Sequence, residues 1–165
     1  MRWRRVLRYT VIAMAIVFVL MQLVPYGWWH DNPPITQAAQ WGDPEAEALA
    51  RSACYDCHSN ESDWPVWSYV APISWLVRSD VEGGRGKLNL SELDGDGGKE
   101  LDDAGETIEE GEMPPSQYVL AHPDAKLSDA EKERLIAAFE ALEESYDDGG
   151  QGGNEDRSGS NSGPG

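Results

Sequence analysis

The feature that most constrains this chain is a short segment in its first half, Cys54-Tyr55-Asp56-Cys57-His58. A Cys-x-x-Cys-His segment is typical of c-type haem attachment, in which the thiols form thioethers and the adjacent imidazole binds iron. The sequence holds 2 cysteines, and both lie in this segment. We therefore expect a fold built around one covalently attached haem c, with Cys54, Cys57 and His58 as its binding residues.

A second iron ligand is expected from the segment Gly111-Glu112-Met113-Pro114-Pro115. A thioether sulfur opposite a histidine gives the His/Met ligation of cytochromes c, and the prolines after Met113 restrict the backbone that carries the sulfur. His122, followed by Pro123, is the alternative distal ligand and would give bis-histidine iron. An open sixth position is the third possibility. His30 has no other candidate ligand around it, so we expect a polar surface residue there.

Two other sites use the Cys-x-x-Cys pattern. A zinc site usually takes four ligands from two separated pairs, and the sequence has no second cysteine pair. A thiol–disulfide redox site is expected within a strand-rich thioredoxin context, whereas the patterns in this chain are helical. Haem attachment is therefore the preferred interpretation, and a thiol redox protein is the less favoured one.

The N-terminal region, residues 1–29, predicts a basic cytoplasmic end and a transmembrane anchor. An uncharged, mostly apolar run over residues 9–24 would form about 24 Å of helix, and aromatic residues extend it toward the membrane interface. The positive-inside rule places the N-terminus in the cytoplasm and the rest of the chain on the periplasmic side of the inner membrane. A cleaved signal peptide is the alternative, but bulky residues follow Val24 where a cleavage site would need small ones. The arginines that precede the run are Arg2, Arg4, Arg5 and Arg8.

The exported part divides into three segments by composition. Residues 30–42 contain Asn32-Pro33-Pro34 and predict an extended tether, because proline hinders helix formation. Residues 43–146 form the expected haem-binding domain. Residues 147–165 are rich in Asp, Gly, Ser and Asn, and this composition predicts a disordered tail.

Helix signals punctuate the expected domain. Asp43 and Pro44 predict a helix start that carries the chain into the haem motif, and Ser128 with Glu131 forms a capping box for the last helix. These two helices are expected to pack together. Pro72 can open a helix that ends at the glycines of residues 83–86. The glycine-rich residues 91–105 predict a flexible loop, and a short helix is expected over residues 102–110.

Aromatic and charged residues add further expectations. Four aromatic side chains could line a haem pocket, and Arg85 is expected to be a surface residue rather than a partner for a haem propionate. The formal net charge is −17, which argues against nucleic-acid binding and suits basic redox partners or adaptation to salty surroundings. The four aromatic residues are Trp64, Trp67, Tyr69 and Trp75.

The chain resembles the haem-binding domain family of small membrane-anchored bacterial c-type cytochromes, over about residues 23–142. The resemblance implies covalent haem at Cys54, Cys57 and His58, and it makes Met113 a reasonable distal ligand. The matching segments are Leu23-Val24-Pro25-Tyr26-Gly27 with Asn32-Pro33-Pro34; Cys54-Tyr55-Asp56-Cys57-His58-Ser59-Asn60-Glu61; Ala71-Pro72-Ile73-Ser74-Trp75-Leu76 with Asp80-Val81; and Gly111-Glu112-Met113-Pro114-Pro115 with Tyr118, His122-Pro123 and Leu127-Ser128.

These observations favour an all-α, small c-type cytochrome-like domain around one haem, behind one N-terminal transmembrane helix. Its expected function is single-electron transfer between membrane or periplasmic redox proteins. A haem-based sensor or assembly module with a displaceable distal ligand is the alternative. We do not expect an enzyme, because no acid–base pair is placed for peroxide chemistry.

Overall fold

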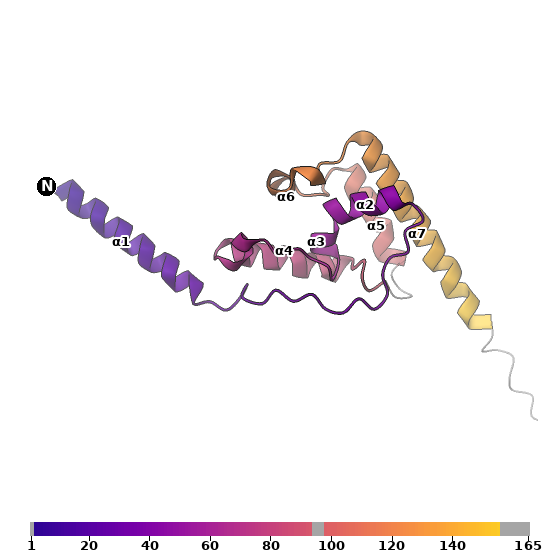
Figure 1. Ribbon diagram of the computed structural model, residues 1–165, viewed down its shortest axis with the longest axis horizontal. Helices are drawn as coiled ribbons and strands as arrows, with labels where there is room; N and C mark the ends of the chain where they lie inside the picture. Colours follow the sequence, from indigo (N-terminus) through magenta and orange to yellow (C-terminus); the bar gives the residue numbers. More distant parts are fainter. Residues whose placement is uncertain (1, 94–97, 156–165) are drawn as a thin grey trace, which may run out of the picture.

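The computed structural model describes residues 2–93 and 98–155, and every named element within them is a helix (Figure 1). The predicted all-α class is therefore confirmed. Two short segments are 3₁₀ helices and carry the label η. The elements are α1 (Arg2–Gln22), α2 (Pro44–Ala53), α3 (Tyr55–His58), η1 (Val66–Tyr69), α4 (Ile73–Lys87), α5 (Gly98–Glu109), α6 (Ser116–Ala121), η2 (Pro123–Ala125) and α7 (Asp129–Glu155).

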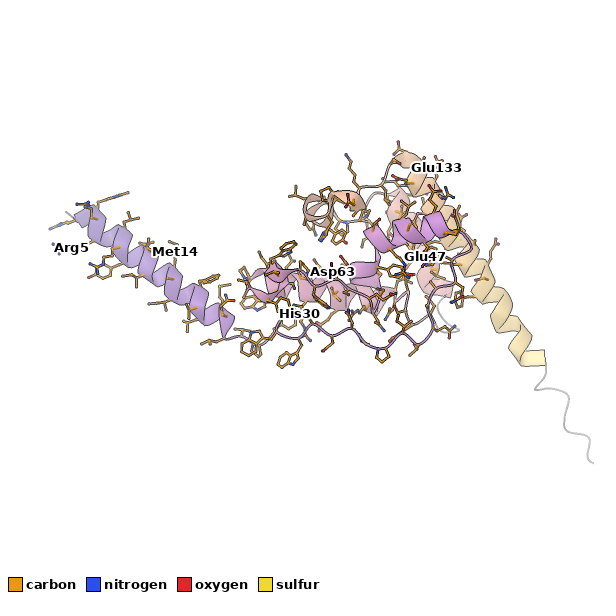
Figure 2. The ribbon with its side chains drawn as sticks, viewed as in Figure 1. Arg5, Met14, His30, Glu47, Asp63 and Glu133 are labelled. Carbon is orange, nitrogen blue, oxygen red and sulfur yellow. The ribbon has the colours of Figure 1, made fainter. Side chains whose placement is uncertain are left out.

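Helix α1 extends away from the other helices and has no buried residue (Figure 1). Its side chains, among them those of Arg5 and Met14, project freely from the ribbon (Figure 2). It begins well before the apolar run and includes the arginines. Within the described residues it is the one helix long and apolar enough to cross a membrane, with a mean hydropathy of 1.6.

The core of the helical domain forms where α2 and α5 pack against α7. Small residues on one face of α2 allow a close approach, and α7 contributes larger apolar side chains. The predicted packing of the helix before the motif against the last helix is confirmed. Residues buried in this core include Ala50 and Ala53 of α2, Leu101 and Ile108 of α5, and Leu135, Phe139 and Leu142 of α7.

Both predicted helix starts are confirmed by their capping bonds. Asp43 accepts a hydrogen bond from the Glu45 backbone at 2.9 Å, as an N-cap residue does. At the start of α7, the Ser128 backbone donates to the Glu131 carboxylate at 2.7 Å, and the Glu131 backbone donates to the Ser128 hydroxyl at 3.4 Å. Arg134 then links the two starts through an ion pair with Asp43.

The helix predicted to begin at Pro72 corresponds to α4. Its predicted end at the glycines of residues 83–86 is wrong, because α4 continues through them to Lys87. The reason is a tertiary contact. A Cβ atom added at Gly84 would lie 2.4 Å from the carbonyl oxygen of Cys57, so α4 passes directly against the motif turn. Only glycine permits this approach, so Gly84 serves packing rather than helix termination.

The predicted loop over residues 91–105 is also wrong for residues 98–101, and the short helix predicted over residues 102–110 is confirmed by α5, which begins earlier, at Gly98, and ends at Glu109. Burial of Leu101 and Ile108 against α7 favours helix despite the glycines. Residues 94–97 of that predicted loop lie outside the described residues. The disordered tail predicted from residue 147 is wrong for residues 147–155, which are helical because α7 continues to Glu155. Residues 156–165 lie outside the described residues.

The predicted tether is extended, but it lies along the domain instead of hanging free. The Gln37 and Ala39 backbones donate to the carbonyls of Ser91 and Leu90 at 3.1 and 2.8 Å. Arg85 reinforces the attachment, donating to the Ser59 carbonyl at 2.7 Å and to the carbonyl of Asp31 in the tether at 2.9 Å. The guanidinium therefore has a structural role.

Candidate haem-binding site

The haem motif occupies the junction of α2 and α3. Cys54 ends α2 as its C-cap, and the next turn carries Tyr55–His58. The backbones of Cys57 and His58 both donate to the Cys54 carbonyl, at 3.1 and 2.8 Å. Both thiols and the imidazole therefore belong to a single turn at the end of a helix, as the sequence predicts.

Two neighbouring cavities open at this turn, with volumes of about 550 Å³ and about 380 Å³. Cys54 lines the first cavity and Cys57 lines the second. His58 and Met113 line both cavities, together with Ala53 and Lys87. The predicted attachment residues and the predicted distal methionine are thus brought to one site.

The imidazole of His58 is held in a form that suits metal binding. Its Nδ1 lies 3.1 Å from the Leu88 carbonyl oxygen, and a carbonyl can only accept, so Nδ1 carries the proton. This leaves Nε2 with a free lone pair. Burial lowers the pKa of His58, so the ring is neutral near pH 7. A ring nitrogen oriented by a backbone carbonyl on its other side is the usual arrangement of a histidine ligand.

Burial also determines the state of the two thiols. It raises the pKa of Cys54 to about 12, with a further contribution from Cys57. Burial first, and then the charge of Asp80, raise the pKa of Cys57 to about 11. Thiol–disulfide redox sites need the opposite shift, because the thiolate is the attacking form. The electrostatics therefore disfavour the thiol redox alternative.

Met113 lies in the turn that follows α5. The backbones of Glu112 and Met113 both donate to the Thr107 carbonyl, at 2.9 and 3.1 Å. Gly111 has a φ of +76°, which lets the chain reverse direction there. The Met113 side chain is partly buried against the core. This turn therefore returns the thioether toward the motif instead of leaving it in solvent.

The other two histidines are placed differently. His122 lines the second cavity but not the first, and its ring is stacked on Tyr118 at a centroid distance of 4.3 Å. His30 lines neither cavity, and its Nε2 lies 2.9 Å from the Ser68 carbonyl oxygen. His30 is therefore a structural residue of the tether, whereas His122 remains near the site.

Two residues at the site were not recognised from the sequence. The Tyr118 hydroxyl donates to the Asp56 carboxylate at 2.7 Å, which ties α6 to the motif turn. Lys87, rather than Arg85, is the basic residue that lines both cavities. Tyr118 belongs to a segment that carries the family resemblance, but no sequence pattern assigns a role to it or to Lys87, because each role arises from the packing of α4 and α6 beside the motif.

The expected aromatic lining is only partly present. Trp67 lines the second cavity, whereas Trp64 and Tyr69 pack on the ring of His30 at centroid distances of 4.5 and 3.9 Å. Trp75 is not among the residues that line either cavity. Two of the four predicted aromatic residues therefore support the tether, and one lines the site.

The residues present fit a haem. An apolar-lined space adjoins two thiols and a neutral imidazole within one turn, and a thioether reaches the same space. These features define a small helical haem-binding domain. The sequence model of the haem-binding domain family matches residues 16–141, so this chain belongs to that family and is a haem protein.

A curated relative points the same way. Cytochrome c peroxidase Ccp of Escherichia coli (strain K12) is 24% identical to this chain over 152 residues. The match includes 81% of this chain and 32% of that protein, so the chain spans about a third of its relative's length. No solved structure matches the chain.

Proposed function

We propose that this protein is a membrane-anchored monohaem c-type cytochrome that transfers single electrons. The observation that carries the proposal is the shared cavity wall, where the Cys54, Cys57 and His58 turn lies beside Met113. When bound, haem supplies an iron centre that gains and loses one electron. The protein's part would be to attach the cofactor, supply ligands to its iron and limit water access.

Each site residue has a distinct role in this proposal. Cys54 and Cys57 would hold the haem through thioethers. The Nε2 atom of His58 and the sulfur of Met113 would bind its iron. His58 and Met113 both line the two cavities, whereas His122 lines only the second, which favours methionine over histidine.

Lys87 has a role in binding the haem periphery. Among the described residues that line the cavities, it is the one lysine or arginine, and its side chain is exposed. Acidic residues, including Glu106 and Glu112, line the first cavity nearby. An ammonium group there can pair with a haem propionate and offset repulsion from these carboxylates.

The proposed location is the inner membrane, with α1 as an uncleaved anchor and the N-terminus in the cytoplasm. The arginines at the start of α1 and the acidic composition of the exported part support this orientation. The haem domain then lies in the periplasm, where its negative charge suits basic redox partners.

Peroxide reduction is the second candidate, because the curated relative is called a cytochrome c peroxidase. Peroxide chemistry and ligand sensing both need an open or displaceable sixth position on the iron. The position of Met113 at the site favours electron transfer. Carbon monoxide separates the classes, since resistance of the reduced protein to binding supports electron transfer and prompt binding supports sensing or catalysis.

The direct test of covalent attachment is the intact mass and visible spectrum of the full chain. The protein is made in a host that assembles c-type cytochromes and is analysed after denaturation. We expect the added mass of one haem and a c-type absorption spectrum, both lost in the Cys54→Ala/Cys57→Ala double variant. A colourless protein with the mass of its amino acids alone would contradict the proposal.

Distal ligation is tested separately with the paired variants Met113→Ala and His122→Ala. Methionine sulfur gives ferric haem a weak long-wavelength charge-transfer band. Met113→Ala should lose that band and allow carbon monoxide to bind, while the covalent haem remains. His122→Ala should keep the band. Absence of the band from the native protein, with carbon monoxide binding gained in His122→Ala and not in Met113→Ala, would assign the distal position to His122.

A further inference from the structure

An exposed apolar surface surrounds η1 and the first turns of α4. Residues 64–77 contain no Asp, Glu, Lys or Arg, although 26% of the chain is charged. Neither the domain core nor a haem in the cavities covers this surface, since Val66 is 83% exposed and Tyr69 is 55% exposed and neither residue lines a cavity of the haem site. We call this surface the apolar corner, and its residues are Val66, Trp67, Tyr69, Val70, Ile73 and Leu76.

The apolar corner lies directly at the end of α1. The amide of Gln22, the last residue of α1, donates to the Ala71 carbonyl at 3.1 Å and accepts from the Ala71 backbone at 3.0 Å. This paired contact joins α1 to the segment between η1 and α4. Figure 1 likewise places the start of α4 close to the end of α1.

The chain that follows α1 is also fixed against α4. Gly27 has a φ of +93°, and a Cβ atom there would lie 2.9 Å from the Ser74 hydroxyl oxygen, so the backbone passes closely over the first turn of α4. Further along α4, the Arg78 guanidinium lies 5.2 Å from the Tyr26 ring centroid, and the Tyr26 hydroxyl donates to Glu82 at 3.1 Å. These contacts set the orientation of the domain relative to α1.

Tryptophans continue the same surface. Trp28 and Trp29 are each 55% exposed, and they follow the point where α1 ends. Tryptophan and tyrosine concentrate where a bilayer meets water. The apolar corner is uncharged, these aromatics flank it, and Arg78 lies at its edge, where its guanidinium donates to the Trp29 carbonyl at 3.4 Å. Such a surface at the base of a membrane-spanning helix has the composition of an interfacial contact.

We propose that the apolar corner rests in the headgroup and acyl boundary of the bilayer that α1 crosses. The proposal deepens the proposed function and rests on α1 being an anchor. Its occupant is lipid, because the corner is continuous with α1 and has no charge that must lose water. Apolar faces that lie along membranes enter this boundary by about 5–10 Å.

Docking has a consequence for the haem site. Trp67, Ile73 and Leu76 belong to the apolar corner and also line the second cavity beside His58. The mouth of that cavity is thereby brought to the bilayer surface. Electron exchange through this side takes place with membrane-bound partners, and soluble partners approach from elsewhere on the domain.

The experiment measures the reactivity of single cysteines in the full-length holoprotein, reconstituted in phosphatidylcholine nanodiscs. Both native thiols are bound to haem there, so an introduced cysteine is the one free thiol. The probe is a membrane-impermeant maleimide, and its reaction is followed by intact mass. The variants are Val66→Cys and Val70→Cys in the corner, Val17→Cys in α1, and Glu133→Cys as the control.

The control position lies away from α1, since Glu133 is an exposed residue near the start of α7 (Figure 2). Docking predicts that both corner variants react several-fold more slowly than Glu133→Cys, and that Val17→Cys is also protected. Because Val66 is 83% exposed, the fold itself gives no such protection. Each variant's visible spectrum confirms that the haem domain is intact.

The experiment distinguishes failure of the docking proposal from failure of the membrane-anchor proposal. Protection of Val17→Cys with fast reaction of Val66→Cys and Val70→Cys overturns lipid docking and keeps the anchor. That result would leave the corner as a surface for another protein. Fast reaction at all four positions overturns the anchor and, with it, the docking.

Discussion

The two walls of the haem site are held in different ways. We call the turn of residues 54–58 with the part of α4 that packs on it the motif wall, and the turn around Met113 with α6 the distal wall. On the motif wall, His58 is fixed by the Leu88 carbonyl through its ring and by the Leu90 backbone through its own carbonyl, at 3.1 and 2.7 Å. Gly84 packs against Cys57 on the same wall. On the distal wall, Met113 lies in a turn, and α6 beyond it has no buried residue.

This difference indicates a division of tasks between the walls. The motif wall is packed backbone against backbone, so its geometry cannot adjust without cost to the fold. The distal wall depends on a few hydrogen bonds and partly exposed side chains. We infer that changes on the motif wall affect folding and haem attachment, whereas changes on the distal wall affect ligation and redox potential.

The largest effect is expected at Gly84, where the motif wall is tightest. In Gly84→Ala the new methyl group meets the Cys57 carbonyl, and backbone cannot move aside as a flexible side chain does. The cost should be about 1–3 kcal/mol or more, as for other overpacked sites. Thermal unfolding followed by circular dichroism measures the cost, and intact mass gives the fraction of chains with attached haem.

Gly83→Ala is the matched control in the same helix. A Cβ atom at Gly83 meets nothing within 4 Å, so alanine should stabilise α4 by up to about 1 kcal/mol. If Gly84→Ala behaves like Gly83→Ala, then α4 does not approach the motif as closely as described, and the contrast between the walls is lost.

A smaller effect is expected from Tyr118→Phe on the distal wall. The change removes the hydrogen bond from the Tyr118 hydroxyl to the Asp56 carboxylate at 2.7 Å. Both groups are half-buried, so the loss should be about 1 kcal/mol. Because Tyr118 lines the second cavity, the redox potential and the methionine charge-transfer band should also change.

Tyr55→Phe provides the comparison from the motif wall. The Tyr55 hydroxyl accepts a hydrogen bond from the Trp41 indole at 3.0 Å, away from both cavities. Its removal should lower the stability without moving the potential or the charge-transfer band. An equal spectral change in both variants would mean that Tyr118 acts only through stability.

The sequence was most informative where the signal is local. The motif turn, the Asp43 cap and the Ser128 capping box each depend on residues within one helical turn, so the pattern alone predicts them. The helical class follows from the same signals. For Met113 the adjacent prolines gave a usable prediction, because they restrict the backbone near the sulfur.

The rest depends on contacts between residues far apart in the sequence. Gly84 looks like a helix terminator until its partner Cys57 is known, and the glycines of α5 suggest a loop until Leu101 and Ile108 are seen buried. Lys87 reaches the cavities only because α4 continues through the glycines to it. Helix propensity is a weak term, and tertiary burial overrides it at these positions.

The smallest effect concerns pH and a contact away from both walls. The hydrogen bond from Arg134, and then the Glu45 backbone, lower the pKa of Asp43 below its ordinary value. A carboxylate with a lowered pKa stabilises the fold above its unfolded pKa of about 3.9, and this stabilisation is lost as pH falls through the folded value. Thermal midpoints measured from about pH 6 down to about pH 3 should therefore decrease less in Asp43→Asn than in the native protein.

Asparagine keeps the N-cap, so the difference between Asp43→Asn and the native protein reports the charge of Asp43. Arg134→Gln should show part of this reduction, because the Glu45 backbone still lowers the pKa of Asp43, and the double variant should match Asp43→Asn. A full additional loss in the double variant would show that Arg134 and Asp43 act independently.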